Sequence, residues 1–110
     1  MAALERAGRE PPAVGELEAS YGPHTASLLR LLERAELIVQ VETDRYYARG
    51  AVDAMTAELR RRMAPGREYA PPELRDILGF SRKYLIPFLE YCDRVGITER
   101  RPAGRVVKGT

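Results

Sequence analysis

Residues 81–84, Ser-Arg-Lys-Tyr, form the segment of the chain with the clearest chemistry, because two cations stand where a helix is predicted to begin. The N-terminus of a helix carries partial positive charge and unpaired N–H groups, so a cation there is unfavourable by about 0.3–1 kcal/mol at an exposed end. A polyanion reverses the sign of this contribution, because helix N-termini and basic side chains both attract phosphate. The arrangement therefore indicates a surface for a negatively charged partner.

Basic residues are concentrated in the last quarter of the chain. Residues 1–80 hold 11 basic and 13 acidic side chains, a balance of −2 (11 − 13), whereas residues 81–110 hold 7 and 3, a balance of +4 (7 − 3). The net charge of +2 and the pI near 8.9 are too mild to indicate nucleic-acid binding by themselves. The distribution is more informative than the total, because it assigns the basic surface to one end of the sequence.

Enzymatic chemistry finds little support in the sequence. There is no glycine-rich phosphate loop, and the chain has one histidine, His24, and one cysteine, Cys92. We therefore predict no catalytic residue, no metal site and no enzymatic activity for this chain. The single cysteine favours a reducing, cytoplasmic setting, and no apolar run approaches the ~18 residues of a membrane span.

The chain repeats itself, without a gap, at an offset of 57 residues (73 − 16 = 57). Glu16-Leu17 aligns with Glu73-Leu74, and Gly22 aligns with Gly79. The alignment continues through the pairs Leu28/Leu85, Leu29/Ile86, Leu31/Phe88, Leu32/Leu89 and Glu33/Glu90. Two copies of one supersecondary unit are the economical interpretation.

Both copies have the same predicted order of elements: a first helix, a short helix ended by a glycine, a longer helix, and two β-like runs around a turn. The helices of the first copy are predicted at Ala2–Ala7, at Glu16–Tyr21 and from near His24, and its strands at Ile38–Val41 and Arg45–Ala48. The helices of the second copy are predicted at 50–64, at Pro72–Leu78 and from near Ser81, and its strands at Ile97–Arg100 and Arg105–Lys108. This order predicts a mainly α fold with small β-hairpins (α+β), a tandem winged helix-turn-helix with domains 1–49 and 50–110.

The long helix of each copy carries a stripe of apolar residues at helical spacing, which we interpret as core. In the first copy the stripe comprises Leu28, Leu31, Leu32 and Ala35. In the second copy it comprises Leu85, Phe88, Leu89, Cys92 and Val95.

The two copies differ at the places where a winged helix contacts nucleic acid, namely the start of the long helix and the wing hairpin. The second copy has Arg82 and Lys83 on the helix, and Arg100, Arg101 and Arg105 on the wing. The first copy has Thr25 and Ala26 on the helix, and Glu42 and Asp44 on the wing. Only the second copy is therefore predicted to bind a polyanion. Tyr84 would either stack on an unpaired base or pack beside Pro87.

Residues 79–98 carry a family resemblance: Ser-Arg-Lys-Tyr, an aliphatic pair and Pro are followed by Leu-Glu-Tyr, Asp-Arg, Gly and Thr. This segment resembles the C-terminal signature of the bacterial selenocysteine-specific elongation factor, the SelB family. The match is specific over roughly residues 70–107 and architectural before them, since that family also ends in a string of winged helices.

The resemblance implies an RNA-binding fragment whose terminal winged helix binds the selenocysteine insertion (SECIS) hairpin of messenger RNA and so directs UGA recoding. By motif position, the RNA-contact role falls on Ser81, Arg82, Lys83, Tyr84, Arg100, Arg101 and Arg105. The resemblance implies no cofactor here, because GTP and Mg belong to the N-terminal domains of the family. We expect a monomer with the hairpin as its partner, the ribosome as a further partner, and no membrane association.

Two other functions stay open. The first is a winged-helix transcription regulator that inserts the same helix into duplex DNA, usually as a symmetric dimer. The second is a protein-interaction scaffold, a role to which the acidic first copy would be suited. Competition between stem-loop RNA and duplex DNA of equal charge separates the RNA-binding function from the DNA-binding one, and a folded chain that binds no RNA at low salt would favour the scaffold.

Overall fold

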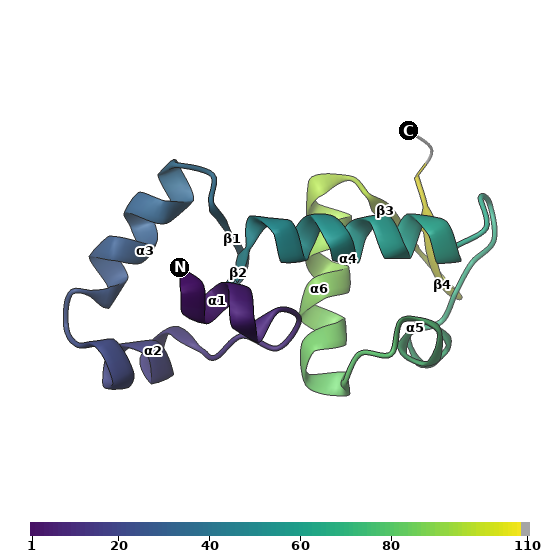
Figure 1. Cartoon of the computed structure of the whole chain (residues 1–110). Helices are drawn as coiled ribbons and strands as arrows, with labels where there is room; N and C mark the ends of the chain where they lie inside the picture. Colours follow the sequence, from purple (N-terminus) through teal and green to yellow (C-terminus); the bar gives the residue numbers. More distant parts are fainter. Residues whose placement is uncertain (109–110) are drawn as a thin grey trace. The chain divides into compact units, whose positions relative to one another are not determined.

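The computed structural model describes residues 1–108, and the chain divides into two compact units, Met1–Asp53 and Ala54–Thr110. The division falls inside helix α4 (Arg49–Arg62), whereas the sequence predicted a boundary after residue 49, at the first residue of the same helix. The structure is mainly helical with two small antiparallel hairpins, which confirms the predicted α+β class (Figure 1).

The first unit contains α1 (Ala2–Ala7), α2 (Val14–Tyr21) and α3 (Thr25–Arg34), followed by the hairpin β1 (Ile38–Glu42) and β2 (Arg45–Ala48). The second unit contains most of α4, then α5 (Pro71–Leu78), α6 (Arg82–Val95) and the hairpin β3 (Thr98–Arg101) and β4 (Gly104–Val107). The order of elements is thus the same in both units. The predicted helices and strands agree with these bounds to within two residues at each end that was predicted.

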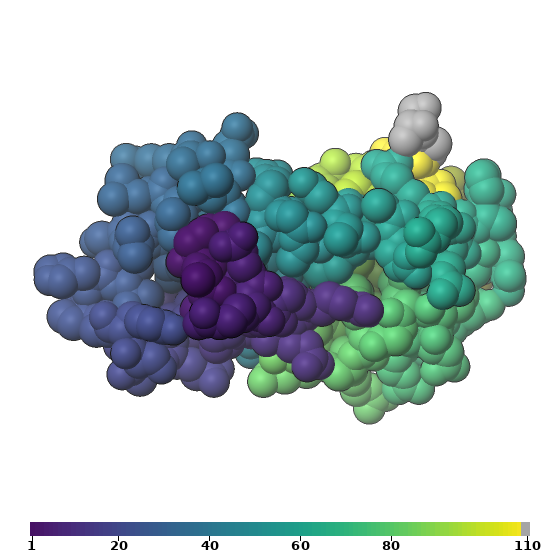
Figure 2. All heavy atoms as spheres, in the orientation of Figure 1, coloured from purple at the N-terminus to yellow at the C-terminus, as the bar shows by residue number. Residues whose placement is uncertain are grey.

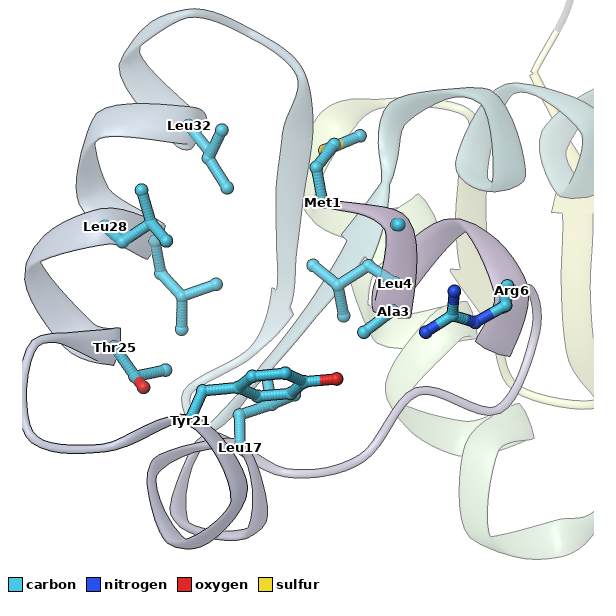
Figure 3. A pocket seen from close by; sticks show the side chains of 11 residues that line it. Met1, Ala3, Leu4, Arg6, Leu17, Tyr21, Thr25, Leu28 and Leu32 are labelled. Atoms are coloured by element: carbon cyan, nitrogen blue, oxygen red, sulfur yellow. The ribbon is translucent and has the colours of Figure 1, made fainter.

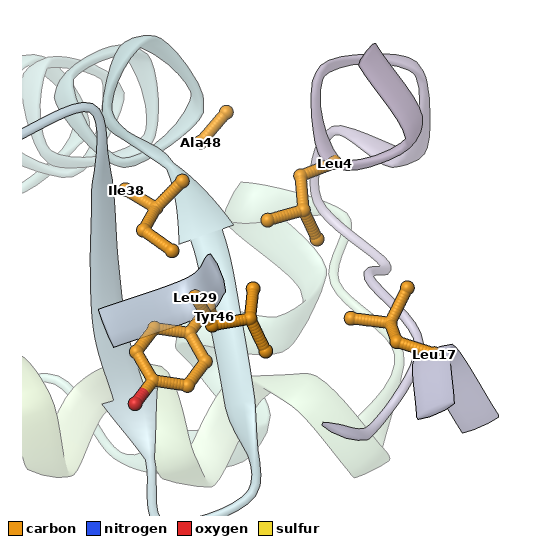
Figure 4. Packing of buried hydrophobic residues seen from close by; sticks show 6 residues of the cluster. All are labelled: Leu4, Leu17, Leu29, Ile38, Tyr46 and Ala48. Carbon is orange, nitrogen blue, oxygen red and sulfur yellow. The ribbon is translucent and has the colours of Figure 1, made fainter. Parts of the chain in front are cut away.

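The core of the first unit forms where α1, α2 and α3 cover one face of the hairpin. Leu29 of α3 packs among Ile38, Tyr46 and Ala48 of the hairpin, and Leu4 and Leu17 complete the cluster (Figure 4). Burying a side chain of this size contributes about 1.5–3 kcal/mol relative to leaving it exposed. Three short helices and a two-stranded hairpin, none of them stable alone, are therefore held together by their shared apolar contacts.

The predicted core stripe of α3 is wrong at two of its leucines and at Ala35, which is exposed at the end of the helix. Leu28 is 53% exposed and Leu31 is 60% exposed, and Leu29 is the buried leucine of this helix instead. Leu28 borders an apolar hollow of about 280 Å³ between α1 and α3, with Tyr21 at one end (Figure 3). In the space-filling view the purple atoms of α1 stand forward of the blue atoms of α2 and α3 (Figure 2). The repeat located the helix correctly, but it could not fix which side of the helix faces the core.

The core of the second unit is built on the inner face of α6. Leu85, Phe88, Leu89 and Cys92 recur at helical spacing and are each at most 2% exposed, which confirms the predicted stripe except at Val95, which is exposed. Other buried residues come from α4, from the position just after it and from α5, and are Met55, Leu59, Met63, Leu74 and Leu78. Phe80, just before α6, places its ring edge-to-face on Phe88 at 5.3 Å between centroids.

The gap-free repeat ends within the third helix of each unit. Helix α3 has 10 residues and α6 has 14, so the residues after the two helices correspond at an offset of 60 (96 − 36 = 60). Gly96 ends α6 with φ +85°, and Glu36 takes the corresponding left-handed position at φ +61°. The following amide donates to the last turn in both units, from Leu37 to the Leu32 carbonyl and from Ile97 to the Cys92 carbonyl. Because α6 is about one turn longer, its apolar stripe and that of α3 cannot both follow the offset of 57.

The wing hairpin of the second unit gains a third chain segment. Tyr69 pairs with Arg105 of β4 through two backbone hydrogen bonds of 2.8 and 2.9 Å. A Cβ atom at the neighbouring Gly104 would lie 2.2 Å from the Tyr69 carbonyl oxygen, so only glycine fits there. The segment before α5 therefore fixes β4 along its outer edge. Over residues 1–108, no helix is long and apolar enough to cross a membrane.

Candidate nucleic-acid interface

The first turn of α6 places its two cations on the surface. Ser81 is the N-cap residue, and its carbonyl oxygen accepts from the amides of Tyr84 and Leu85, both at 3.1 Å. Arg82 and Lys83 are exposed, while Leu85 and the preceding Phe80 are buried and anchor the turn on both sides. The side-chain hydroxyl of Ser81 accepts no capping hydrogen bond from the N–H groups of this turn. The turn thus presents two cations together with the positive end of the helix dipole.

Tyr84 lies half-buried beside these cations. The Lys83 ammonium lies 5.5 Å from the centroid of the Tyr84 ring, within the range of a cation–π contact. This contact directs the lysine side chain across the aromatic ring. A base that stacked on Tyr84 would therefore meet the Lys83 ammonium at the same place.

The wing presents its two arginines on opposite faces. Side chains alternate along a strand, so Arg100 shares a face with Thr98, and Arg101 shares the other face with Glu99. The Thr98 hydroxyl bonds to Asp93 of α6, which identifies the first face as the one turned toward α6. Arg101 forms an ion pair with Glu99 on the other face. Arg100, and not Arg101, therefore lies on the face of the wing that is turned toward α6.

The structure places Arg105 in the interior instead of on the exposed surface of the wing. This residue is 4% exposed, and its Nε donates to both carboxylate oxygens of Asp93, at 3.0 and 3.2 Å. Thr98 donates its hydroxyl to Oδ1 of the same carboxylate at 2.6 Å. The predicted RNA contact through Arg105 does not fit this burial, because the guanidinium is already paired and shielded from solvent. Composition could not distinguish a buried arginine from an exposed one.

Three of the predicted cations, Arg82, Lys83 and Arg100, have no carboxylate among the described residues that competes with an external anion. Across residues 1–108, the described ion pairs include no carboxylate partner for Arg82, Lys83 or Arg100. In contrast, Glu58 pairs with both Arg61 and Arg62 at the end of α4. The first group is thus available to phosphate, whereas part of the Arg60–Arg62 run is already neutralised.

The corresponding turn of the first unit has a different chemistry. Thr25 is buried, and its hydroxyl donates to the Gly22 carbonyl at 2.7 Å. The wing of this unit carries Glu42 and Asp44, and Glu42 pairs with Arg45 at 3.0 Å. Neither place offers an exposed cation, as the sequence predicted.

Metal binding and thiol chemistry receive no support from the described geometry. Among residues 1–108, no group of three or more His, Cys, Asp or Glu side chains is arranged to hold a metal ion. Burial, with a smaller contribution from the Asp93 carboxylate, raises the pKa of Cys92 to about 12. The thiol is therefore protonated at neutral pH and serves as a core residue.

Asp93 and Thr98 were not predicted as functional residues. Asp93 stood only among the acidic residues of the C-terminal quarter and in the family signature, and Thr98 only in a predicted strand and in the same signature. The indication for Thr98 is that a polar residue replaces an apolar one. Thr98 pairs with Val107 in the second hairpin, and the corresponding pair in the first hairpin is Ile38 with Ala48. A polar residue in a buried strand position calls for a hydrogen-bond partner.

Comparison with known proteins gives concordant matches. Residues 63–107 match the family described as elongation factor SelB, winged helix. A selenocysteine-specific elongation factor of Desulfomicrobium baculatum is 35% identical over 75 residues, which are 68% of this chain and 12% of that protein. The chain thus spans only a small part of the length of this curated relative.

Two solved structures share the fold. The mRNA-binding domain of elongation factor SelB from E. coli, in complex with SECIS RNA, has a TM-score of 0.78 and 28% identity, covering 98% of this chain and 95% of that one. The crystal structure of a bacterial selenocysteine-specific elongation factor has a TM-score of 0.74 and 24% identity, covering 89% of this chain and 16% of that one. The second likeness shows the fold alone.

Proposed function

Residues 63–107 form a winged-helix domain of the SelB family, and we propose that this chain is the part of a selenocysteine-specific elongation factor that binds the SECIS stem-loop of messenger RNA. The observation that carries the proposal is the likeness, over 98% of the chain, to a domain solved in complex with SECIS RNA. The exposed cations of the second unit support it, because they lie where a winged helix meets nucleic acid.

In this proposal, phosphate contacts supply most of the affinity. Arg82, Lys83 and Arg100 would each neutralise a phosphate and release a counterion, so affinity falls linearly with salt on a log–log plot. Specificity would come from unpaired loop bases, because the deep major groove of A-form RNA excludes a helix. In the same proposal Tyr84 and Ser81 contact such a base or its sugar, and these contacts complete the proposed site.

In this proposal the other activities of the elongation factor belong to parts of the protein outside this chain. We propose that GTP and Mg²⁺ bind other domains, that this chain acts as a monomeric binding module without catalysis, and that it works in the cytoplasm beside the ribosome. Holding the factor at the hairpin would raise its local concentration near the UGA codon.

Competition binding tests the proposed function directly. The chain is titrated against a fluorescent SECIS stem-loop, taken both from E. coli and from the genome that encodes this chain, and then challenged with unlabelled duplex DNA of equal charge. We expect the stem-loop to resist displacement at matched salt. Equal displacement would support the DNA-binding alternative or unspecific electrostatics, and a folded chain that bound neither nucleic acid would support the scaffold.

A further inference from the structure

The carboxylate of Asp93 joins three elements of the second unit. It belongs to the last turn of α6 and accepts from Thr98 of β3 and from Arg105 of β4. The Arg105 side chain is 5% exposed and the Asp93 side chain 23% exposed, so the pair is largely shielded from water. Removing either partner of an ion pair at this depth is destabilising, because the remaining charge would be poorly solvated.

The Asp93 carboxylate also offsets the repulsion between two arginines of the wing. Arg100 and Arg105 are directly opposite one another in the β3–β4 register, and their side chains therefore share one face of the hairpin. Like charges at such a pair repel, which would push the exposed Arg100 away or distort the strand. Asp93 of α6 neutralises the charge of Arg105. The second arginine, Arg100, can therefore lie opposite Arg105 on the same face without strong repulsion.

The first unit builds the same junction without ions. By register, Gln40 and Tyr46 occupy the positions of Arg100 and Arg105, and Ile38 occupies that of Thr98. Tyr46 and Ile38 belong to the apolar cluster with Leu29, so packing holds that wing to its helix. Glu33 occupies the position of Asp93, at the offset of 60 found at the helix end (93 − 33 = 60), and its charge helps burial to raise the pKa of the Tyr46 hydroxyl. The ionic junction thus occurs in the unit that carries the exposed cations.

We propose that Asp93 is a positioning residue for RNA binding: through Thr98 and Arg105 it holds the wing against α6, so that Arg100 meets the same RNA as Arg82 and Lys83. The inference rests on the proposed function, since it needs an RNA whose backbone spans the helix start and the wing. Asp93 itself touches no RNA in this scheme. Its effect on affinity is exerted through Arg100.

The sign of one substitution separates positioning from simple electrostatics. Asp93→Asn keeps the size of the side chain and makes the surface more positive, which by charge alone favours RNA. We expect instead a loss of stem-loop affinity of roughly three- to tenfold, on the order of one misplaced charge–phosphate contact. The matched control is Glu90→Gln, which removes an exposed carboxylate from the same helix without touching the wing, and it should bind as tightly as the wild type or slightly more tightly.

A double-mutant cycle tests whether the effect passes through Arg100. In an Arg100→Ala background, Asp93→Asn should change affinity by less than about twofold, because the positioned contact is already gone. In an Arg82→Ala background the full loss should persist. An equal loss in both backgrounds would overturn the proposal, because general destabilisation would then be the cause.

Two milder variants decide the matter if Asp93→Asn does not fold, as judged by circular dichroism at the assay temperature. Arg105→Lys keeps the charges but loses the planar guanidinium, and Thr98→Val keeps the ion pair but loses the hydroxyl. Both should lower affinity by roughly twofold to fivefold in an Arg100-dependent manner. Wild-type affinity in both would overturn the positioning role, whereas a wild-type chain that binds no stem-loop would contradict the proposed function itself.

Discussion

The third helices of the two units, α3 and α6, occupy the same place in the same order of elements and yet present opposite surfaces. Helix α3 begins with a buried Thr25 and exposes Leu28 and Leu31. Helix α6 begins with exposed Arg82 and Lys83 and buries its leucines. A fold therefore determines where side chains are presented, whereas the residues at those places determine what can bind.

The wings extend the contrast. The first wing carries carboxylates and is joined to its helix by apolar packing, and the second carries exposed arginines and is joined by an ionic cluster. The two junctions differ in how strictly they fix the position of the wing. Apolar packing tolerates small shifts, whereas a buried ion pair whose carboxylate also accepts a hydroxyl hydrogen bond fixes distance and direction together. The stricter junction belongs to the unit for which we propose an RNA contact.

The largest effect should come from truncating the two leucines that the repeat aligns but the structure separates. Leu85→Ala removes a fully buried side chain and should lower the free energy of unfolding by about 2–5 kcal/mol. Leu28→Ala, at a half-exposed position, should change it by no more than about 0.5 kcal/mol. Urea denaturation of both variants measures the difference. Comparable losses would mean that Leu28 is buried in solution.

The next effect concerns affinity. Arg82→Ala/Lys83→Ala should weaken stem-loop binding by roughly 10–100-fold, since each lost charged contact costs on the order of 0.7–1.4 kcal/mol and 1.4 kcal/mol is a factor of ten. The matched control in the other unit is Arg30→Ala/Arg34→Ala, which removes two exposed arginines from α3. Fluorescence anisotropy at fixed salt compares them, with thermal melting as the check of folding. A similar loss in the control would move the interface away from α6.

The smallest effect distinguishes the two faces of the wing. Arg100→Ala should weaken binding by roughly three- to tenfold and reduce the slope of the log–log salt plot by about one. Arg101→Ala should stay within about twofold of wild type, because its guanidinium is paired with Glu99 on the opposite face. If Arg101 proved the more important residue, the RNA would have to cross the outer face of the hairpin.

Local patterns in the sequence were sufficient for the elements and for most of their bounds. Glycine after α5 and α6, the apolar spacing of α6 and the turn residues between strands act over a few residues, so they can be recognised along the chain. The same local logic identified Arg82 and Lys83, because an exposed cation at a helix start is unusual on dipole grounds alone.

The partners of the charged wing residues could not be predicted in this way. Arg100, Arg101 and Arg105 look equivalent in the sequence, but strand alternation and the position of α6 give each a separate environment. The orientation of α3 was missed for a related reason. Several apolar residues crowd that helix, and the hairpin selects Leu29 for the core while Leu28 stays at the surface.

The pattern of residues along the chain was enough to establish which segments become helix or strand, that the two halves share one order of elements, and that only the second half gathers exposed cations at a helix start. Those properties depend on neighbours a few residues away. Two further properties follow from the packing of β3 and β4 against α6: Arg105 turns inward to Asp93, and Arg100 lies on the face of the wing that is turned toward α6. Such outcomes depend on contacts between residues distant along the chain, and burial then selects, among chemically identical side chains, the one that can be paired away from water.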